Sequence, residues 1–237
     1  MNNLTDGEYD LTIYVPTKGR PGNALRLQEQ FYNTIKLNSR IVFIISDNDK
    51  KADQYQGLNE AMVVTPDRPG FVSPLNLGYL KDRRKIYSYA VGFMGDDHMP
   101  RTLGWDEIFI NNLMEMGSGF VYGRDGLQDA AIPTYVAMTA DIPLTLDFMT
   151  LPSLMHLYAD NFWLELGKAI NSIRYIPEVY VEHMHPAVGK SISDAGYVFS
   201  SDSALDKADK AEYHRYLVDD LEHHAKILSG MIRRQVI

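Results

Sequence analysis

Short apolar runs alternate with segments of helical spacing along the first half of the chain. Four runs rich in β-branched and aromatic residues have the length of buried strands, and they cover residues 11–15, 41–45, 62–65 and 89–94. Apolar residues recur at helical spacing between the first two runs and again before the fourth, at about residues 74–87. This alternation predicts an α/β fold with a mostly parallel central sheet and helices on both faces.

The second half of the chain has a more mixed pattern. Strands are predicted at residues 120–122, 135–138 and 175–181, and helices after Thr102 and Asp160. Residues 189–203 are polar and contain Gly and Ser, which is typical of a mobile loop, and a long polar helix is predicted over residues 209–234. We therefore expect one α/β domain over residues 1–200 and a C-terminal helical extension over residues 201–237.

Polar side chains follow three of the predicted strands at the points where these strands end. They lie in residues 17–20, 47–49 and 96–98. Ligands of open parallel sheets bind beyond the carboxyl ends of the strands. The three segments are therefore expected to meet at one edge of the sheet and to form the binding site.

Asp96 and Asp97 are adjacent carboxylates directly after a buried run. Two such charges repel each other unless something positive lies beside them, and Mn²⁺ or Mg²⁺ prefers oxygen ligands of this kind. An Asp-rich surface turn is the alternative, because Asp is favoured in turns.

His183 and His185 end a later predicted strand. The alternation of side chains along an extended segment puts both imidazoles on one face. Together with Asp97 they would suit Mn²⁺ better than Mg²⁺. The alternative is a pair of partly buried histidines that only make hydrogen bonds.

Two further motifs are candidates for chemistry. Asp160 opens a predicted helix, where it can act as an N-cap, as a general base, or as both. The turn containing Pro16, Thr17 and Arg20 follows the first strand and could hold a nucleotide through backbone groups and the guanidinium. It matches neither the Walker A pattern nor the G-x-G-x-x-G pattern of dinucleotide-binding folds.

The composition of the chain limits the classes of protein to which it can belong. The chain of 237 residues has no cysteine, which excludes disulfides, zinc–thiolate sites and a cysteine nucleophile. Its net charge of −8 argues against a protein that coats nucleic acid. The N-terminus does not look like a signal peptide, and no apolar run reaches the roughly 18 residues of a membrane span. We expect a cytoplasmic location.

Taken together, the order of these motifs resembles that of inverting GT-A glycosyltransferases over roughly residues 10–196. Residues 15–21 are similar to the "P-T-x-x-R" start of that family, and residues 95–97 look like a variant of its D-x-D motif in which Gly95 replaces the first Asp. Residues 95–106 and 158–163 resemble small glycosyltransferases encoded by bacteriophages.

The resemblance implies a GT-A domain with a divalent cation, Mn²⁺ or Mg²⁺, on the diphosphate of a nucleotide-sugar donor, UDP-sugar being favoured. Asp97 and either His183 or His185 would hold the cation, and Asp160 would be the base of an inverting transfer. A D-x-H register, with Asp96 and His98 as ligands, is the alternative.

The same resemblance implies the contacts of the nucleotide. Asp47 and Asp96 would contact the nucleoside, and Arg83 or Arg84 would approach the diphosphate. The acceptor would be phage DNA or a virion protein, and the location would then be the cytoplasm of the host cell.

Two alternative functions belong to other classes of protein. A sugar-nucleotide nucleotidyltransferase would carry a Gly-rich phosphate loop after the first strand, where this chain has only Gly19. A non-catalytic sugar- or nucleic-acid-binding module would not need carboxylates and histidines at three strand ends. Release of nucleotide from a donor separates the second reading from an enzyme.

Overall fold

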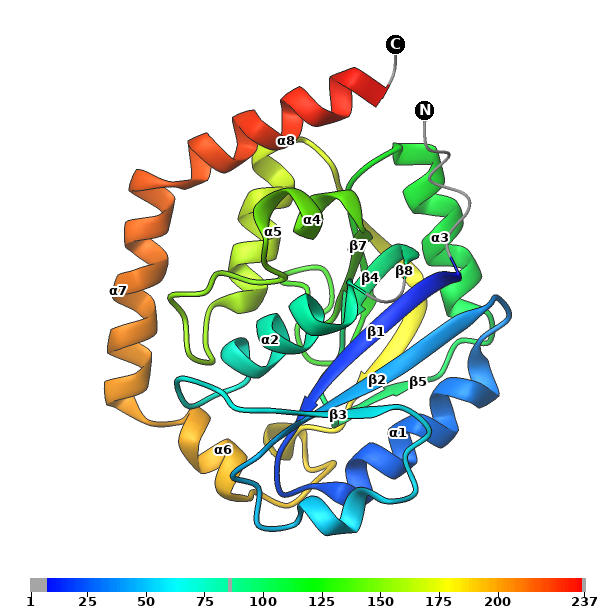
Figure 1. Cartoon of the computed structure of the whole chain (residues 1–237), viewed down its shortest axis with the longest axis vertical. Coiled ribbons are helices and arrows are strands. Elements are labelled where there is room, and N and C mark those ends of the chain that lie inside the picture. The colour runs from blue at the N-terminus through cyan, green and yellow to red at the C-terminus, as the bar shows by residue number, and fades with distance from the viewer. Residues whose placement is uncertain (1–7, 85–86, 236–237) are drawn as a thin grey trace.

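The fold is built on one mixed sheet, seen in Figure 1 with β1 and β2 crossing the front of the molecule. The structure is a computed structural model that describes residues 8–84 and 87–235. Eight strands follow the order β3-β2-β1-β4-β7-β6-β8-β5. Their bounds are β1 Tyr9–Thr17, β2 Ser39–Ser46, β3 Ala61–Val64, β4 Ser88–Phe93, β5 His98–Pro100, β6 Phe120–Arg124, β7 Val136–Thr139 and β8 Ile173–His183.

Parallel pairing dominates this sheet. β1 pairs in parallel with β2 and β4, β2 with β3, and β6 with β8. β7 runs antiparallel to β4 and β6, and β5 runs antiparallel to β8. The carboxyl ends of β1, β2 and β4 therefore meet at one edge, and the predicted mostly parallel sheet is confirmed.

Helices cover both faces of the sheet, as the alternation predicted. The side chains of β1 divide between two apolar layers because successive residues of a strand point to opposite faces, with Ile13 in one layer and Tyr14 in the other. The first layer includes Phe31 of α1 and Phe109 of α3, and the second includes Trp163 of α5. The helices are α1 Pro21–Thr34, α2 Val72–Asp82, α3 Trp105–Met116, α4 Asp141–Leu146, α5 Ala159–Ala169, α6 Ala195–Ser200, α7 Ser203–Asp219 and α8 Leu221–Gln235, with short 3₁₀ turns η1 Ala52–Tyr55 and η2 Pro186–Val188.

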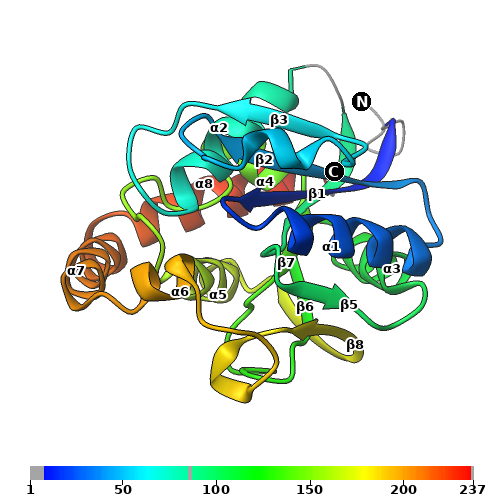
Figure 2. The ribbon, with the colours of Figure 1, turned by 90° about the horizontal axis from the view of Figure 1, so that it is seen from below.

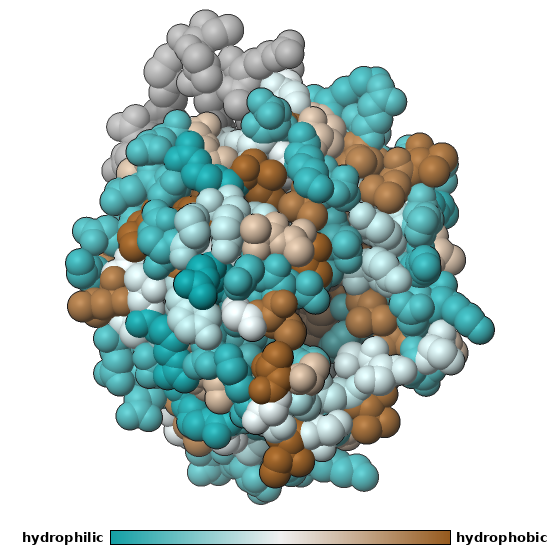
Figure 3. All heavy atoms as spheres, turned by 180° about the vertical axis from the view of Figure 1, so that it is seen from behind, coloured by the Kyte–Doolittle hydropathy of each residue, from teal (hydrophilic) through white to brown (hydrophobic). Residues whose placement is uncertain are grey.

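Seen from below, α6 and α7 lie with α5 at one end of the molecule, and α1 and α3 lie at the other (Figure 2). On the face opposite to that of Figure 1, apolar side chains are scattered in small groups among polar ones, around a hollow near the middle (Figure 3). In the described part of the chain, no helix has the length and apolar character needed to cross a membrane.

Two helix predictions are wrong. The predicted long helix over residues 209–234 is two helices, α7 and α8, which meet at Asp220. The change of direction lays α8 across α4 and α5 (Figure 1) and buries Ala225 and Leu228 in the core. Thr102 does not cap α3, because its hydroxyl donates to the carbonyl of Glu178, and Gly104 with φ of 72° precedes the helix instead.

The C-terminal helices hold the segment that leads into α5. Asp209 of α7 is fully buried, and its carboxylate accepts from the backbone N–H groups of Met155, His156 and Leu157 at 2.9, 2.8 and 2.7 Å. The hydroxyl of Tyr158 donates to Asp206 at 2.9 Å. The predicted extension therefore positions residues of the predicted α/β domain, although the division at residue 200 stays a prediction.

We predict that Asp209→Ala lowers the free energy of unfolding by roughly 2 to 4 kcal/mol, because three partly buried N–H groups lose a charged, fully buried acceptor. Asp219→Ala, at the exposed end of the same helix, is the matched control and should change stability by less than about 0.5 kcal/mol. Urea unfolding of both variants measures the difference. Equal stabilities would show that Asp209 does not hold the 155–157 segment.

Candidate functional site

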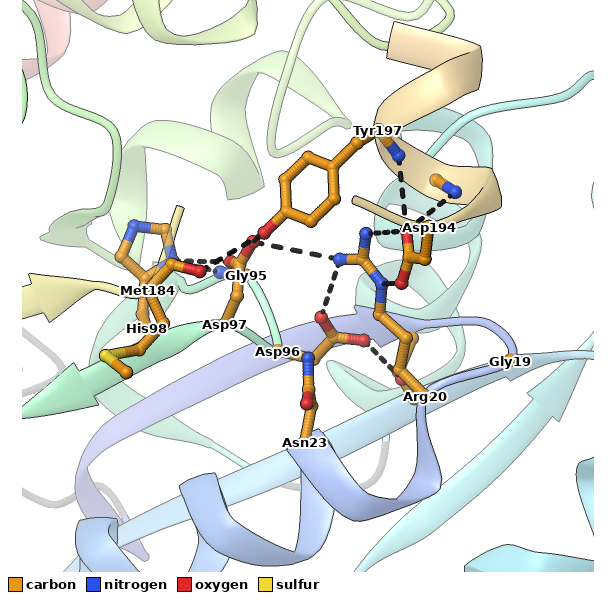
Figure 4. Close-up of polar contacts among 12 residues, drawn as sticks. Gly19, Arg20, Asn23, Gly95, Asp96, Asp97, His98, Met184, Asp194 and Tyr197 are labelled. Carbon is orange, nitrogen blue, oxygen red and sulfur yellow. Dashed lines mark hydrogen bonds and ion pairs between the residues drawn. The ribbon is translucent and has the colours of Figure 1, made fainter. Parts of the chain in front are cut away.

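The ends of β1 and β4 meet through Asp96. The hydroxyl of Thr17 donates to Asp96 Oδ2 at 2.7 Å. Nη1 of Arg20 lies 3.2 Å from Asp96 Oδ1 and 3.7 Å from Asp97 Oδ2 (Figure 4). Pro16, the residue before Thr17, lies in β1. The structure thus brings the first-strand turn and the acid pair into contact.

The segment after β2 joins this cluster through Asp49 rather than Asp47. Asp49 is buried, and its Oδ2 accepts from the backbone N–H of Gly19 at 2.6 Å and from the hydroxyl of Tyr55 at 3.0 Å. Asp47 is exposed and accepts from the hydroxyl of Thr65 at 2.6 Å. Asp47 therefore lies at the same edge of the sheet but faces solvent.

Asp97 is the residue on which several elements converge. Its Oδ2 accepts from the hydroxyl of Tyr197 at 2.6 Å and lies 3.6 Å from Nε2 of His183. Its Oδ1 lies 3.6 Å from Nδ1 of His98, and its backbone carbonyl accepts from the N–H of Met184 at 2.8 Å. The end of β8 is thereby held against the acid pair.

The three histidines near Asp97 differ in their hydrogen bonds. His98 and His183 face each other in the β5–β8 register with rings stacked 4.4 Å apart, and Nδ1 of His98 accepts from the N–H of Gly95 at 2.9 Å. The ring of His185 lies 5.1 Å from that of His183, and its Nδ1 accepts from the N–H of Ala187 at 3.1 Å. Nδ1 of His98 is therefore already occupied by Gly95, so the D-x-H register would leave only Nε2 of this ring for a cation.

Burial and charge separate the two carboxyls of the acid pair. Burial and the neighbouring Asp97 raise the pKa of Asp96 to about 6, against the opposing effect of Arg20. Burial alone would also raise the pKa of Asp97, but His183, His98 and Tyr197 outweigh it and hold that pKa well below its ordinary value. Asp97 is thus the stronger acid of the pair and stays ionised in the pH range in which Asp96 titrates.

The surroundings shift the pKa values of His98 and His183 in opposite directions. Burial, followed by the positive charge of His183, lowers the pKa of His98 to about 4. Burial also acts to lower the pKa of His183, but Asp125 and Asp97 outweigh it and raise that pKa to about 9. His183 is therefore the histidine most strongly coupled to acidic partners.

A segment between β8 and α7 closes over the acid pair. Asp194 binds Arg20 through two bonds of 2.6 Å, to Nε and Nη2, and the guanidinium lies 4.4 Å from the ring centre of Tyr197 (Figure 4). Asp194 also caps α6 by accepting from the N–H groups of Gly196 and Tyr197. Within the region predicted to be a mobile loop, Ala195–Ser200 thus forms a short helix, and Asp194 and Tyr197 contact Arg20 and Asp97.

Asp160 lies in the first turn of α5, not at its cap. Tyr158, with φ of 64°, precedes the helix, and Asp160 Oδ1 accepts from the N–H of Asn161 at 2.9 Å. The predicted N-cap role is therefore wrong, because the left-handed Tyr158 shifts the start of the helix by two residues. Burial raises the pKa of Asp160, against the opposing effect of the hydrogen bond from Asn161.

Arg83 and Arg84 are not brought to the acid pair. α2 ends at Asp82, and Arg83 binds Asp147 at 2.7 Å beside Ser88, the first residue of β4. The acid pair follows the other end of β4, and six strand residues span about 20 Å. The prediction of a diphosphate contact from these arginines is therefore not supported, because α2 carries them to the amino end of the strands.

Several site residues were missed from the sequence. They are Tyr55, Asp125, Asp194 and Tyr197. Asp125 follows β6, so the rule that polar residues cluster after strand ends would have found it. The contacts of Asp194 and Tyr197 have no local sequence signal, because they depend on how the segment folds back.

The residues at Asp97 suit a divalent cation that the protein holds with few ligands. Among the described residues, no group of three or more His, Asp or Glu side chains is arranged to hold a metal ion. Asp97 Oδ2 and His183 Nε2 face each other at 3.6 Å, a separation that two ligands of one ion can have. Cations that bind nucleotides commonly take one or two protein ligands, with phosphates and water completing the shell.

Comparison with known proteins finds solved structures of similar fold but no match in sequence. No protein-family model matches the chain, and no curated protein matches it in sequence. Among solved structures, it is similar to TarS of S. aureus in complex with UDP-GlcNAc, with a TM-score of 0.62 and 14% identity over 95% of this chain and 72% of that one. The fold is that of the GT-A glycosyltransferases.

Two further solved structures have a similar fold. A mannosyltransferase from Pyrobaculum calidifontis, in complex with GDP-Man and Mn²⁺, matches with a TM-score of 0.55 and 14% identity over 97% of this chain and 81% of that one. Glucosyl-3-phosphoglycerate synthase from Mycobacterium tuberculosis, in complex with Mn²⁺, UDP-Glc and glycerol 3-phosphate, matches with a TM-score of 0.54 and 11% identity over 75% and 73% of the two chains. The predicted GT-A fold is thus confirmed.

We predict that Asp194→Asn increases the rate of chymotryptic cleavage at Tyr197 and Phe199 by roughly 3- to 10-fold, because the segment loses its charged bond to Arg20. Cleavage of an opening segment follows the population of its open form. Asp202→Asn, which caps α7 without contacting Arg20, is the control. If Asp194→Asn is cleaved as slowly as the wild type, Asp194 does not hold the segment closed.

Proposed function

We propose that this protein is a glycosyltransferase that transfers a sugar from a nucleoside diphosphate donor in a reaction that needs Mn²⁺ or Mg²⁺. The observation that carries the proposal is the convergence on Asp97 of His183, Arg20 and Tyr197 at the carboxyl edge of the sheet. Structures of the same fold are complexes with UDP-GlcNAc, GDP-Man and UDP-Glc, and two of them contain Mn²⁺.

In this proposal Asp97 and a histidine, His183 or His185, hold the cation. When bound, the cation would neutralise the charge that develops on the leaving nucleoside diphosphate. Asp97 is suited to this role because it stays ionised in the pH range in which Asp96, with a pKa of about 6, takes up a proton. Asp47, at the exposed end of β2, and Asp96 would contact the nucleoside of the donor, for which we favour UDP.

Arg20 is the cation that the chain itself supplies to the acid pair. Its guanidinium now bridges Asp96 and Asp194, with 16% of the side chain exposed. Arg suits the geometry of phosphate groups. When the segment carrying Asp194 opens, Arg20 would face the diphosphate, and its reclosure would keep water away from the donor.

We predict that release of nucleoside diphosphate from a donor screen of UDP-GlcNAc, UDP-Glc and GDP-Man requires Mn²⁺ and stops in EDTA. Asp97→Asn should reduce the rate by roughly 10²- to 10³-fold, the scale for losing one group that stabilises developing charge. His98→Gln distinguishes this site from the D-x-H register, in which Asp96 and His98 would bind the cation. His98 is not a cation ligand in this proposal, so His98→Gln should stay active. If His98→Gln abolishes activity while Asp97→Asn leaves it intact, Asp96 and His98 are the ligands.

Asp160 is the proposed general base of an inverting transfer. It would take the proton of the acceptor hydroxyl while that oxygen attacks the anomeric carbon from the face opposite to the leaving diphosphate. A base must be ionised to act. Because burial raises the pKa of Asp160, activity should fall with decreasing pH at a higher pH than for an ordinary aspartate, whose pKa is about 3.9.

We predict that Asp160→Asn lowers the rate of transfer by roughly 10²- to 10⁴-fold and leaves donor affinity and melting temperature near their wild-type values, because an amide cannot accept the proton. Glu165→Gln, on the same helix and paired with Lys168, is the matched control. The pH profile of kcat/KM should lose its acidic limb in Asp160→Asn. An unchanged rate and an unchanged profile would place the base elsewhere.

The acceptor is proposed from the sequence resemblance to bacteriophage enzymes. It would be modified phage DNA or a virion protein, and the reaction would then take place in the cytoplasm of the host.

A further inference from the structure

Asp125 is a buried carboxylate that lies behind His183 and has no part in the proposed reaction so far. It follows β6, and only 1% of its surface is exposed. Its Oδ1 accepts from three successive backbone N–H groups, those of Leu127, Gln128 and Asp129, at 2.9, 2.7 and 2.8 Å. These three bonds fix the orientation of the carboxylate.

The other oxygen of this carboxylate points at His183. Oδ2 accepts from the hydroxyl of Thr134 at 2.8 Å and lies 3.6 Å from Nδ1 of His183. The backbone N–H of His183 donates to the carbonyl of Asp125 at 2.9 Å, which holds the two residues side by side. A separation of 3.6 Å exceeds that of a hydrogen bond, but contacts of this kind often shorten when a site is loaded.

This arrangement decides which nitrogen of His183 is free. An ionised carboxylate can only accept, so Nδ1 is the nitrogen that carries a proton towards Asp125. By the same rule Nε2 carries a proton towards Asp97 Oδ2, 3.6 Å away, as long as no cation is bound. A cation at Asp97 would displace the proton of Nε2, whereas Nδ1 would keep its proton towards Asp125. A histidine that binds a metal through Nε2 needs this form of the ring.

His185 and His98 are held in the opposite way. Nδ1 of His185 accepts from the N–H of Ala187, and Nδ1 of His98 accepts from the N–H of Gly95. A neutral ring whose Nδ1 accepts carries its proton on Nε2. Of these three histidines, His183 is therefore the one whose Nε2 is prepared to bind a cation at Asp97.

We propose that Asp125 is a positioning residue that makes His183, rather than His185 or His98, the imidazole ligand of the divalent cation held by Asp97. The inference rests on the proposed function, because it assumes that a cation binds at Asp97. It goes further by assigning the ligand and the residue that orients it.

Asp125→Asn tests the inference with little change in shape. The amide oxygen can keep the three bonds to the 127–129 backbone, so the NH₂ group takes the place of Oδ2. That NH₂ group can donate to Thr134 and to Nδ1 of His183, which favours the ring with its proton on Nε2. The ring would then turn an N–H, not a lone pair, towards Asp97.

The measurement is Mn²⁺ affinity in the presence of UDP, followed by the electron paramagnetic resonance signal of free Mn²⁺. Asp125→Asn and His183→Ala should each weaken binding by roughly 10- to 100-fold, the usual scale for losing a partner that orients a metal ligand. His185→Ala should change it by less than about 3-fold. Asp129→Asn, in the same loop but without contact to His183, is the matched control and should bind as the wild type does.

A double-mutant cycle separates orientation from the mere loss of a negative charge. In a His183→Ala background, Asp125→Asn should weaken Mn²⁺ binding no further, whereas a charge effect would persist at the same factor. A persisting factor, or a larger loss in His185→Ala than in His183→Ala, overturns the inference. If the wild type itself binds no Mn²⁺ with UDP, the proposed function fails instead.

Nitrogen chemical shifts of the wild type keep the inference testable if Asp125→Asn does not fold. With Mg²⁺ and UDP bound, ¹⁵N-labelled His183 should carry its proton on Nδ1, and Nε2 should show the shift of a metal-bound nitrogen. A proton on Nε2 of His183 in the loaded protein would contradict the assignment.

Discussion

Two neighbouring carboxylates at the buried end of β4 are the constraint on which the arrangement of the site depends. Asp96 and Asp97 are 5% and 7% exposed, so water cannot neutralise their repulsion. Side chains from distant segments provide the compensating positive charge and hydrogen-bond donors. They are Arg20 from the turn after β1, His183 from the end of β8, and Tyr197 from α6. The same need for positive charge makes this edge of the sheet suited to a divalent cation.

The C-terminal half of the chain provides the geometry around this acid pair. β5 follows directly from it and pairs with β8, so that His98 and His183 stack. Asp125 and the backbone of Asp97 both bind the end of β8. Asp209 of α7 holds the segment that leads to Asp160. Residues that are far apart in sequence are thus connected by backbone N–H groups that donate to the carbonyls of Asp97 and Asp125 and to the carboxylate of Asp209.

The sheet and its covering helices were predictable because they follow from local patterns. Buried strands appear in the sequence as apolar runs, so the positions of β1 to β4 could be inferred. Because helices connect parallel strands, the convergence of Thr17, Asp49 and Asp96 at one edge could be inferred as well. The remaining features depend on tertiary contacts. Asp194 meets Arg20 across a sequence separation of 174 residues, which no local pattern predicts.

The errors have more than one origin. Arg83 was predicted to lie near the diphosphate, although a helix between parallel strands returns the chain to the amino end of the next strand, which the predicted alternation already implies. The break between α7 and α8 follows from the burial of Leu228, and the left-handed Tyr158 moves the start of α5. Which histidine serves as ligand was also open, since it depends on partners such as Asp125 rather than on the spacing of His183 and His185.

The central claim is that the acid pair binds a nucleoside diphosphate through a divalent cation. Calorimetric titration of UDP and GDP into the wild-type protein, first with Mn²⁺ and then with excess EDTA, tests it most directly. The account predicts saturable binding of at least one of them with Mn²⁺, and an affinity at least roughly 10-fold weaker in EDTA. Equal affinity in both conditions would contradict the account, because the nucleotide would then be held without a cation at Asp97.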